Sequence, residues 1–389
     1  MCLRRKNIIH IGDHNLDFDI RVKAQIASLG NSYSNFYCRE KQRPNFFIDK
    51  YYFSFLLFLV KASLTGLFKI KKIYIIYKKH KLTFPIVNYN VFFVYKYFFK
   101  NTIKILNSIK ENKPDVVIAN DLACGLIAAY CKKKFNIPYY YDSHEFQIFR
   151  NYRNSFLKCI LVSGLEHIVI NNSLKYCVVN KKIGFYYKYL YQKKGSVVVN
   201  NFYASRKFFK QDDFNLKERF NIVYFGYIRS GRGLEYLEYF QQLDQIDKIF
   251  IYTDLGQQTH LTDKLKILPK VICAAYPRSL IQLQLGQALG LCLIENVALS
   301  YTFSLPNKFF QYLACGIPII TISNTYLAEI VTKFKIGVVI SEKDFKENIS
   351  NYLDTFDKVI TNFPLARKKC IEHFSRNNYD NFFENNKLS

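Results

Sequence analysis

Two arginines in the second half of the chain have the chemistry needed to bind phosphate groups. Arg229 and Arg232 lie in the segment YFGYIRSGRGLEYL, among the glycines Gly226, Gly231 and Gly233, where an apolar run gives way to a helix-like pattern. Glycines let the backbone approach a ligand, and two guanidinium groups beside a helix N-terminus suit a diphosphate. Because arginines beside a glycine turn are also common on plain surfaces, this segment alone leaves both interpretations open.

The segment SLPNKFFQYLACGIPII (304–320) adds further polar side chains. Pro306 suits the first position of a helix that follows a strand and a loop. Within this helix, Asn307, Lys308 and Gln311 share one face by their spacing. A cation and two amides at a helix N-terminus favour a pocket for the ribose and phosphates of a nucleotide. The alternative is a surface helix whose polar face is simply solvated.

A sheet is needed to position these side chains, and both halves of the chain alternate strand-like with helix-like segments. Strands are predicted over 7–11, 114–121, 137–145, 176–180 and 196–201, and then over 219–225, 248–254, 270–275, 291–295 and 317–322. Such alternation predicts parallel sheets covered on both faces. The predicted fold class is therefore α/β, with two doubly wound, Rossmann-like domains that face each other across a cleft. Ligands bind such sheets beyond the carboxyl ends of the strands.

The length of 389 residues fits two domains. Residues 203–218 carry no clean periodicity and are predicted to be a linker. We therefore expect a first domain over 1–205, a second over 206–370, and a closing helix and tail over 371–389.

The positive charge is concentrated in the first half of the chain. The net charge is +26, and residues 1–205 hold 33 Lys and Arg against 11 Asp and Glu, a net charge of +22. Such asymmetry indicates an anionic partner for the first half, either nucleic acid, a phosphorylated lipid or an anionic bilayer surface. The alternative is a lysine-rich genome, which should load both halves alike.

An apolar stretch raises the question of a membrane. Residues 51–68 are interrupted only by Lys61, and Lys69, Lys71 and Lys72 follow. A spanning helix needs about 20 apolar residues, and a central lysine is costly there. The pattern favours an interfacial helix with its lysines at the headgroups, and thus peripheral membrane contact. The alternative is an internal helix of the first domain.

The ten cysteines are scattered singly, without a CxxC pair. Their spacing indicates neither a zinc site nor a disulfide framework, and it suits a reducing cytosol.

Seven segments, in register along the chain, resemble those of a known enzyme family. SLPNKFFQYLACGIPII resembles the LPNK-x-x-E-Y-x-A-x-G-x-P signature of GT-B-fold glycosyltransferases, particularly the large retaining family 4. The segments DFDIRVKAQIASLG, KPDVVIANDL, YYYDSHE, VVVNNFY and IVYFGYIRSGRGLEYL are similar to its motifs in the same order, and HFSRNNYDNFF looks like its closing helix.

The resemblance implies a transferase that moves a sugar from a nucleotide-sugar to an acceptor, with retention at the anomeric carbon and with no cofactor or obligatory metal. It implies donor contacts in the second domain from Gly226, Arg229, Arg232, Pro306, Asn307, Lys308 and Gln311. In the first domain it places His144 and Glu145 at the reacting carbon, and Asp13, Asp17, Arg21 and Asp121 on the acceptor side.

The first domain would thus be the acceptor-side domain, and a lipid-linked or glycan acceptor at the inner face of a membrane agrees with its basic, aromatic composition. Surface polysaccharide or lipopolysaccharide synthesis is the commonest role of such relatives. An alternative of another class is a nucleic-acid-binding protein, but no recognisable nucleic-acid module is present, so no such partner is expected. Phe303 and Gln311 stand where many relatives have glutamates, which leaves a catalytically inactive GT-B scaffold as a further alternative. An epimerase fits the motif order less well.

Overall fold

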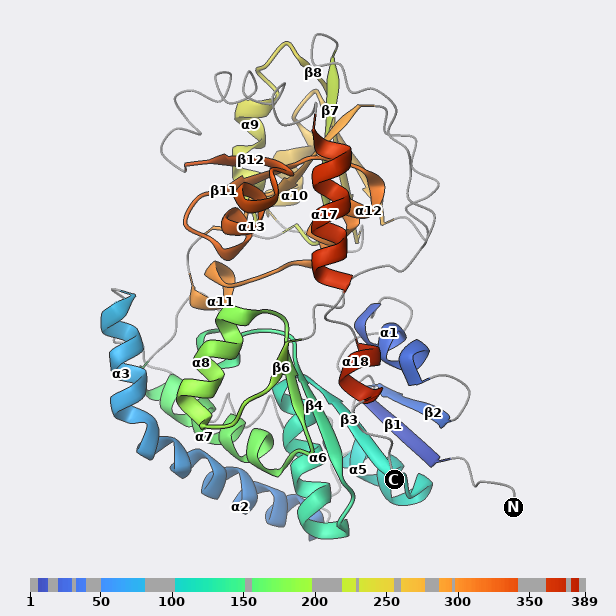
Figure 1. Cartoon of the computed structure of the whole chain (residues 1–389), viewed down its shortest axis with the longest axis vertical. Coiled ribbons are helices and arrows are strands. Elements are labelled where there is room, and N and C mark those ends of the chain that lie inside the picture. Colours follow the sequence, from blue (N-terminus) through green and yellow to red (C-terminus); the bar gives the residue numbers. More distant parts are fainter. Residues whose placement is uncertain are drawn as a thin grey trace. The chain divides into compact units, whose positions relative to one another are not determined.

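A computed structural model of the chain describes residues 6–12, 20–29, 33–39, 50–80, 102–150, 156–197, 219–228, 231–254, 260–276, 287–295, 298–341, 362–375 and 379–384 (Figure 1). The chain divides into two compact units. Unit 1 comprises residues 1–200, 298–300 and 377–389, and unit 2 comprises residues 201–297 and 301–376. The predicted linker at 203–218 lies outside the described residues.

Unit 1 is built on a parallel sheet with the strand order β2–β1–β3–β4–β5–β6. The strands are β1 Lys6–Gly12, β2 Tyr33–Arg39, β3 Val116–Asn120, β4 Tyr139–Ser143, β5 Tyr176–Val178 and β6 Ser196–Val197. Every residue of β3, β4 and β5 is buried, as expected for a parallel sheet that is covered on both faces. The strand order reverses between β1 and β3, so the carboxyl ends of these two strands mark a ligand-binding position.

Helices cover this sheet. They are α1 Ile20–Leu29, α2 Lys50–Leu64, α3 Ile70–Lys79, α5 Thr102–Asn112, α6 Asp121–Phe135, α7 Phe156–Asn172, α8 Lys181–Tyr191 and α18 Tyr379–Glu384, with 3-10 turns η2 Thr65–Lys69 and η3 Gln147–Phe149 (Figure 1). The helix α18 follows unit 2 in the sequence but packs its rings of Phe382 and Phe383 against Tyr140 of β4.

Unit 2 repeats the architecture with the strand order β12–β11–β10–β7–β8–β9, again all parallel. The strands are β7 Phe220–Phe225, β8 Ile246–Thr253, β9 Val271–Ala275, β10 Ala288–Cys292, β11 Ile319–Ile322 and β12 Gly337–Ile340. The helices are α9 Leu237–Phe240, α10 His260–Lys266, α12 Asn307–Cys315, α13 Tyr326–Phe334 and α17 Phe363–Ser375, with the 3-10 turn η4 Leu234–Tyr236. The short helix α11 Leu299–Thr302 has residues assigned to both units. The strand order reverses between β7 and β10. The predicted α/β class with two doubly wound sheets is confirmed.

Several elements differ from the prediction. The strands β2 and β12, at one end of each sheet, were not predicted. Strand β10 spans Ala288–Cys292 rather than 291–295, because the ring of Tyr312 packs on Gly290, where a Cβ would lie 2.5 Å from the ring. Pro306 is the residue before the first helical residue of α12, in an extended conformation, rather than the first helical residue itself.

The predicted helix over 51–68 is interrupted at Thr65, where α2 gives way to η2. The cause is a close approach to α7. A Cβ at Gly66 would lie 1.9 Å from the carbonyl oxygen of Ile160, and a Cβ at Gly164 would lie 2.5 Å from the backbone of Ala62. The hydroxyl of Thr65 also donates to the carbonyl of Gly164, at 3.1 Å. One face of this segment is therefore fixed on α7. None of the described helices is both long enough and apolar enough to cross a membrane.

Candidate functional site

In unit 2, the loop after β7 has a backbone that only glycine adopts easily. Gly226 has φ +130° and its N–H donates to the carbonyl of Tyr252, while Gly231 and Gly233 both have φ +77°. Gly233 also leaves no room for a side chain, since a Cβ would lie 2.1 Å from Cβ of Leu293. The loop is thus held against the residues that follow β10. These two strands flank the point where the strand order reverses.

Arg232 projects from this loop onto an aromatic ring. Its Cζ lies 4.8 Å from the ring centroid of Tyr301, a cation–π contact that orients the guanidinium group. Arg229, the other predicted phosphate ligand, lies outside the described residues.

Lys308 lies in the first turn of α12 and is buried, with 6% of its surface exposed. Its Nζ lies 3.9 Å from the ring centroid of Tyr224 and has no hydrogen-bond partner among the residues that the structure describes. The pKa of Lys308 is lowered to about 7. Burial is the largest cause, Arg232 lowers the pKa as well, and Cys292 raises it in part. The site thus keeps a buried cation near a second cation, an arrangement that an anionic ligand would stabilise.

The remaining predicted residues of α12 divide between surface and interior. Asn307 is exposed, whereas Gln311 is buried. The amide Nε2 of Gln311 donates to the hydroxyl of Tyr276, which follows β9. Phe303, at the other position where many relatives have a glutamate, is buried. Gln311 therefore has a defined hydrogen bond, and it brings no charge to this group of residues.

Two side chains fix α12 in place. The hydroxyl of Tyr312 lies 3.0 Å from the carbonyl oxygen of Val223 and 2.9 Å from that of Leu291, on the two central strands. At the other end of the helix, Arg367 of α17 donates from Nε to the carbonyl of Leu313, at 2.5 Å, and from Nη2 to that of Ala314, at 2.8 Å. These bonds satisfy carbonyls that a helix C-terminus leaves without partners. They hold the first turn of α12, with Lys308, at the end of the sheet.

In unit 1, a buried ionic cluster lies at the carboxyl ends of β1, β3 and β4. Nη2 of Arg21 donates to Oδ1 of Asp142 at 2.6 Å, and Nε2 of Gln25 donates to Oδ2 at 2.9 Å. Tyr379 of α18 donates to the same Oδ2. Gln25 also donates to Oδ1 of Asn120 at 2.8 Å. Burial raises the pKa of Asp142, but Arg21 and His144 outweigh it and hold this pKa far below its usual value.

His144 lies between two carboxylates. Its Nδ1 is 3.7 Å from Oδ2 of Asp121 and its Nε2 is 3.6 Å from Oδ2 of Asp142. Its backbone N–H donates to Oδ1 of Asp121 at 3.2 Å. Burial lowers the pKa of His144, but Asp121 and then Asp142 outweigh it and raise this pKa to about 9. The ring is therefore an imidazolium at neutral pH. Its buried Nε2 makes no hydrogen bond to any residue that the structure describes.

Asp121 holds this arrangement at the cost of backbone strain. It has φ +65° although it is not glycine, directly after β3. Such a conformation costs about 1–3 kcal/mol and is typical of functional sites. Its Oδ1 also accepts from Nε2 of Gln147 at 2.7 Å, and Arg150 lies 3.8 Å from Oδ2. Glu145 has a different environment, because its carboxylate is 38% exposed and pairs with Nε of Arg150 at 3.0 Å.

Beneath the loop that carries His144 lies a buried carboxylate, Glu166. The hydroxyls of Tyr141, Tyr187 and Tyr191 all bond to it. Burial raises the pKa of Glu166 to about 7, although the three tyrosine hydroxyls lower it. The hydroxyl of Tyr187 also lies 2.8 Å from Oγ of Ser143 and 3.2 Å from the carbonyl oxygen of Glu145. Glu166 thus supports the loop from below.

The structure groups the predicted residues by unit. His144, Arg21 and Asp121 lie together in unit 1, and Lys308 and Arg232 lie together in unit 2, whereas Asp13, Asp17 and Arg229 lie outside the described residues. Five residues that contact this group of side chains were not predicted from the sequence: Asp142, Gln25, Tyr379, Glu166 and Tyr276. Asp142 had a local signal, because it precedes His144 at the end of a predicted strand. Tyr379 had none, since it lies 237 residues from Asp142.

Comparisons with known proteins agree with this architecture. Residues 234–361 match the domain family described as Glucosyltransferase 3-like, C-terminal domain. No curated protein matches the chain in sequence. The fold is similar to that of sucrose-phosphate synthase from Thermosynechococcus elongatus, with a TM-score of 0.60, 13% identity, and coverage of 96% of this chain and 95% of that one.

Two further structures share the fold. HepE from Anabaena in complex with UDP and glucose has a TM-score of 0.58 at 10% identity, and covers 95% of both chains. The lipopolysaccharide outer core galactosyltransferase WaaB has a TM-score of 0.51 at 14% identity, with the same coverage. The chain therefore has the GT-B fold of glycosyltransferases, and its second unit carries a match to the Glucosyltransferase 3-like C-terminal domain.

Proposed function

We propose that this protein transfers a sugar from a nucleotide-sugar donor to a lipid-linked or glycan acceptor, with retention at the anomeric carbon. The observation that carries this proposal is Lys308, a buried ammonium group without a hydrogen-bond partner among the described residues, in the first turn of a helix. The match to a glucosyltransferase domain and the complexes of HepE with UDP and UDP-glucose support a donor of this class.

The donor diphosphate binds at Lys308 and Arg232, with Arg229 and the glycine loop contributing. Because Lys308 is buried and has a lowered pKa, an anion beside it restores the charged ammonium form. The leaving group is a nucleoside diphosphate, and two fixed cations stabilise the charge that develops on it. We propose that these side chains do so without a metal ion. Gln311 binds a ribose hydroxyl through its amide.

His144 acts on the sugar side of the reaction. As an imidazolium held between Asp121 and Asp142, it supplies a fixed positive charge beside the bound substrates. Asp142 and Asp121 hold its orientation and its charge. We assign Glu145, Arg21, Asp13 and Asp17 to the reacting-carbon and acceptor side.

The acceptor is carried at a membrane surface. The segment α2–η2–α3 presents large apolar side chains to solvent together with lysines, and Phe68 is 88% exposed. A basic apolar face of this kind suits the interface of an anionic bilayer. We therefore place the protein at the inner face of a membrane by peripheral contact, in surface polysaccharide or lipopolysaccharide synthesis.

Thermal unfolding with UDP, GDP and their sugar conjugates tests the donor site. A ligand at a hundred times its Kd adds about 2.7 kcal/mol of stability. We expect one nucleotide to raise the Tm, Lys308→Met and Arg232→Ala to abolish the shift, and EDTA to leave it unchanged. His144→Asn retains the shift and loses turnover, and Lys264→Ala on α10 is the control. Tight nucleic-acid binding without any nucleotide shift contradicts the proposal.

Turnover distinguishes an active enzyme from an inactive scaffold. The relevant positions are Gln311 and Phe303, which bring no carboxylate. We expect the wild-type chain to release the nucleoside diphosphate when membranes supply the acceptor. If the donor binds but no nucleoside diphosphate is released, and Gln311→Glu restores release, the chain is a scaffold that lost its carboxylate.

A further inference from the structure

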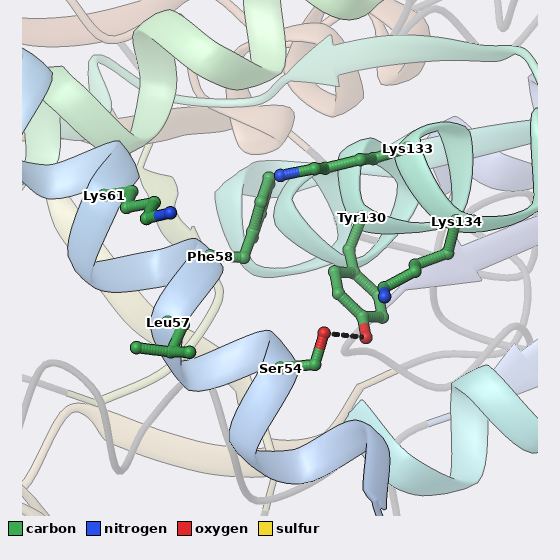
Figure 2. A pocket seen from close by; sticks show the side chains of 7 residues that line it. All are labelled: Ser54, Leu57, Phe58, Lys61, Tyr130, Lys133 and Lys134. Carbon is green, nitrogen blue, oxygen red and sulfur yellow. Dashed lines mark hydrogen bonds between the residues drawn. The ribbon is translucent and has the colours of Figure 1, made fainter.

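A cavity of about 280 Å³ lies between α2 and α6 in unit 1, away from the cluster around His144 (Figure 2). Lys61 of α2 and Lys133 and Lys134 of α6 line it, and none of the described residues in its wall is acidic. Figure 2 shows Lys61 and Lys133 reaching from the two helices toward the ring of Phe58. Nζ of Lys133 lies 5.9 Å from the centroid of this ring.

The floor of the cavity is ordered by polar and aromatic contacts. The hydroxyl of Tyr130 donates to Oγ of Ser54 at 3.0 Å, and the Tyr130 ring makes an edge contact with Phe58 at 5.7 Å. These contacts join α2 to α6 at the base of the cavity. The three lysines are exposed, and among the described residues of the wall none has a charge of opposite sign. The cavity is thus an electropositive hollow with an aromatic base.

One residue of the cavity wall, Leu57, also belongs to the exposed apolar side chains of α2, η2 and α3. Leu57 lines the cavity and is 45% exposed, and it begins a stripe of exposed large apolar side chains that continues along the chain: Val60, Leu64, Leu67, Phe68, Ile70, Tyr74 and Ile75. The opposite face of this segment is fixed on α7 through Gly66 and Gly164. The sequence has no Asp or Glu between Asp49 and Glu111. The segment that forms this surface is therefore apolar and basic, with no acidic residue of its own.

We propose that this cavity binds the phosphate group of an anionic lipid, whose acyl chains lie along the apolar stripe. Lysine ammonium groups bind phosphate as point charges, and three of them around one hollow match the charge of a lipid phosphate. The apolar stripe that begins at Leu57 argues for a lipid rather than a free phosphate, because a soluble anion gains nothing from it. This inference rests on the membrane contact proposed above and adds a specific headgroup site to it.

The test is flotation of the full chain with phosphatidylcholine vesicles, with and without phosphatidylglycerol, at one ionic strength. Lys133→Ser/Lys134→Ser removes two charges from the cavity. Lys71→Ser/Lys78→Ser removes two exposed charges from α3, outside the cavity, and is the matched control. Leu57→Trp keeps all the lysines and narrows the cavity. The Tm of each variant and its shift by the donor nucleotide verify that both units are folded.

Each lysine near an anionic surface contributes about fivefold to binding, so the control variant loses on the order of 25-fold. We expect the cavity variant to lose at least about tenfold more than the control. Leu57→Trp lowers the ratio of anionic to neutral binding even though it retains the charge. If the two double variants lose binding equally and Leu57→Trp binds as the wild type does, the proposed headgroup site is overturned. The proposed membrane contact is then unaffected. If the wild-type chain floats with neither kind of vesicle, the headgroup site and the membrane contact are both overturned. Donor binding is measured separately, so that result does not depend on flotation.

Soluble glycerol phosphate and inorganic phosphate form the last arm. Neither is expected to raise the Tm at millimolar concentration. Suppose that phosphate raises the Tm of the wild type but not that of Lys133→Ser/Lys134→Ser, and that the wild type does not prefer anionic vesicles. The cavity then binds free phosphate, and the proposed lipid ligand is overturned.

Discussion

The hydroxyl of Tyr379 donates a hydrogen bond to Oδ2 of Asp142, a residue 237 positions earlier in the chain. Asp142 also receives hydrogen bonds from Arg21 and Gln25 and lies 3.6 Å from Nε2 of His144. The C-terminal helix α18 therefore supplies one donor to the carboxylate that holds the charge of His144.

Removing this hydroxyl weakens unit 1 and spares the donor site. We expect Tyr379→Phe to lower the free energy of unfolding by about 1.5–3 kcal/mol, as for a hydrogen bond to a charged group. Urea denaturation measures this loss, and nucleotide titration should give an unchanged Kd. Tyr189→Phe, at a partly buried position on α8, is the control. Equal stability of the two variants would contradict the role of Tyr379.

The charge of His144 predicts a pH-dependent stability. Its pKa in the folded protein is about 9, above the ordinary 6.5. Its contribution is therefore fully present below pH 6.5 and is lost as the pH rises through 9. We expect the stability advantage of the wild type over His144→Asn to shrink by about 2–4 kcal/mol between pH 6 and pH 10. Denaturant titrations at several pH values measure it, and a constant difference would show that the imidazole is neutral.

The contribution of Lys308 to stability is expected to change with pH in the opposite direction. Its folded pKa of about 7 lies below the ordinary 10.5, so the unfolded chain binds more protons between these values and the contribution of Lys308 to stability rises with pH across this window. We expect Lys308→Met to stabilise the free protein at pH 7 by at least about 1 kcal/mol. Denaturant unfolding without ligand checks this, and a destabilised variant would contradict it.

The same lysine makes donor binding pH-dependent. Because the diphosphate favours the ammonium form, we expect the affinity for the nucleotide-sugar to fall up to about tenfold per pH unit above pH 7. Calorimetry with the nucleotide-sugar, whose diphosphate has no terminal phosphate to titrate, measures this slope. Lys308→Arg should remove it, since arginine stays charged. An equal slope in that variant would assign the titration to another group.

The loop after β7 allows a matched test of backbone strain. Gly226 and Gly233 both have positive φ, but a Cβ at Gly226 has its nearest contact at 3.7 Å, whereas one at Gly233 lies 2.1 Å from Cβ of Leu293. We expect Gly226→Ala to cost about 1–2 kcal/mol for its conformation alone. Gly233→Ala should cost about 1–3 kcal/mol more, because the sheet must shift. Thermal unfolding compares the two, and equal losses would contradict the close packing.

Tyr187 positions the loop that carries His144. Its hydroxyl lies between Glu166 below and Ser143 and the carbonyl of Glu145 above. We expect Tyr187→Phe to lower kcat by about tenfold with little change in KM for the donor. Tyr191→Phe, which loses a bond to the same Glu166 but does not reach the loop, is the matched control. Equal kcat values in the two variants would show that the network only adds stability.

A strand could be predicted where both of its faces are buried, because such a strand needs a continuous run of apolar residues. Strands β3, β4 and β11 have such runs and were found. Strand β2 was not, because its sequence YSNFYCR mixes aromatic and polar residues at one end of the sheet. Strand β10 was displaced, since Gly290 has a low strand propensity and is required by the ring of Tyr312.

The candidate site was predictable only where its signal is local in sequence. Lys308 and His144 each belong to a short motif. Their positions after a strand could therefore be predicted from the alternation of strands and helices in the sequence. Gln25 and Tyr379 have no such motif, because their partners come from distant segments. Lys308 packs on Tyr224 of β7, a contact with a distant segment that spacing along one helix does not reveal.

The return of α18 to unit 1 has a consequence for biosynthesis. Phe382 and Phe383 complete a core with Ile8, Val116 and Tyr140, although they leave the ribosome only after the whole of unit 2. Domains generally fold in order from the N-terminus during synthesis. Here the first unit emerges with an apolar surface that stays uncovered until the whole of unit 2 has been synthesised. The nascent chain therefore depends on protection from aggregation while unit 2 is being synthesised.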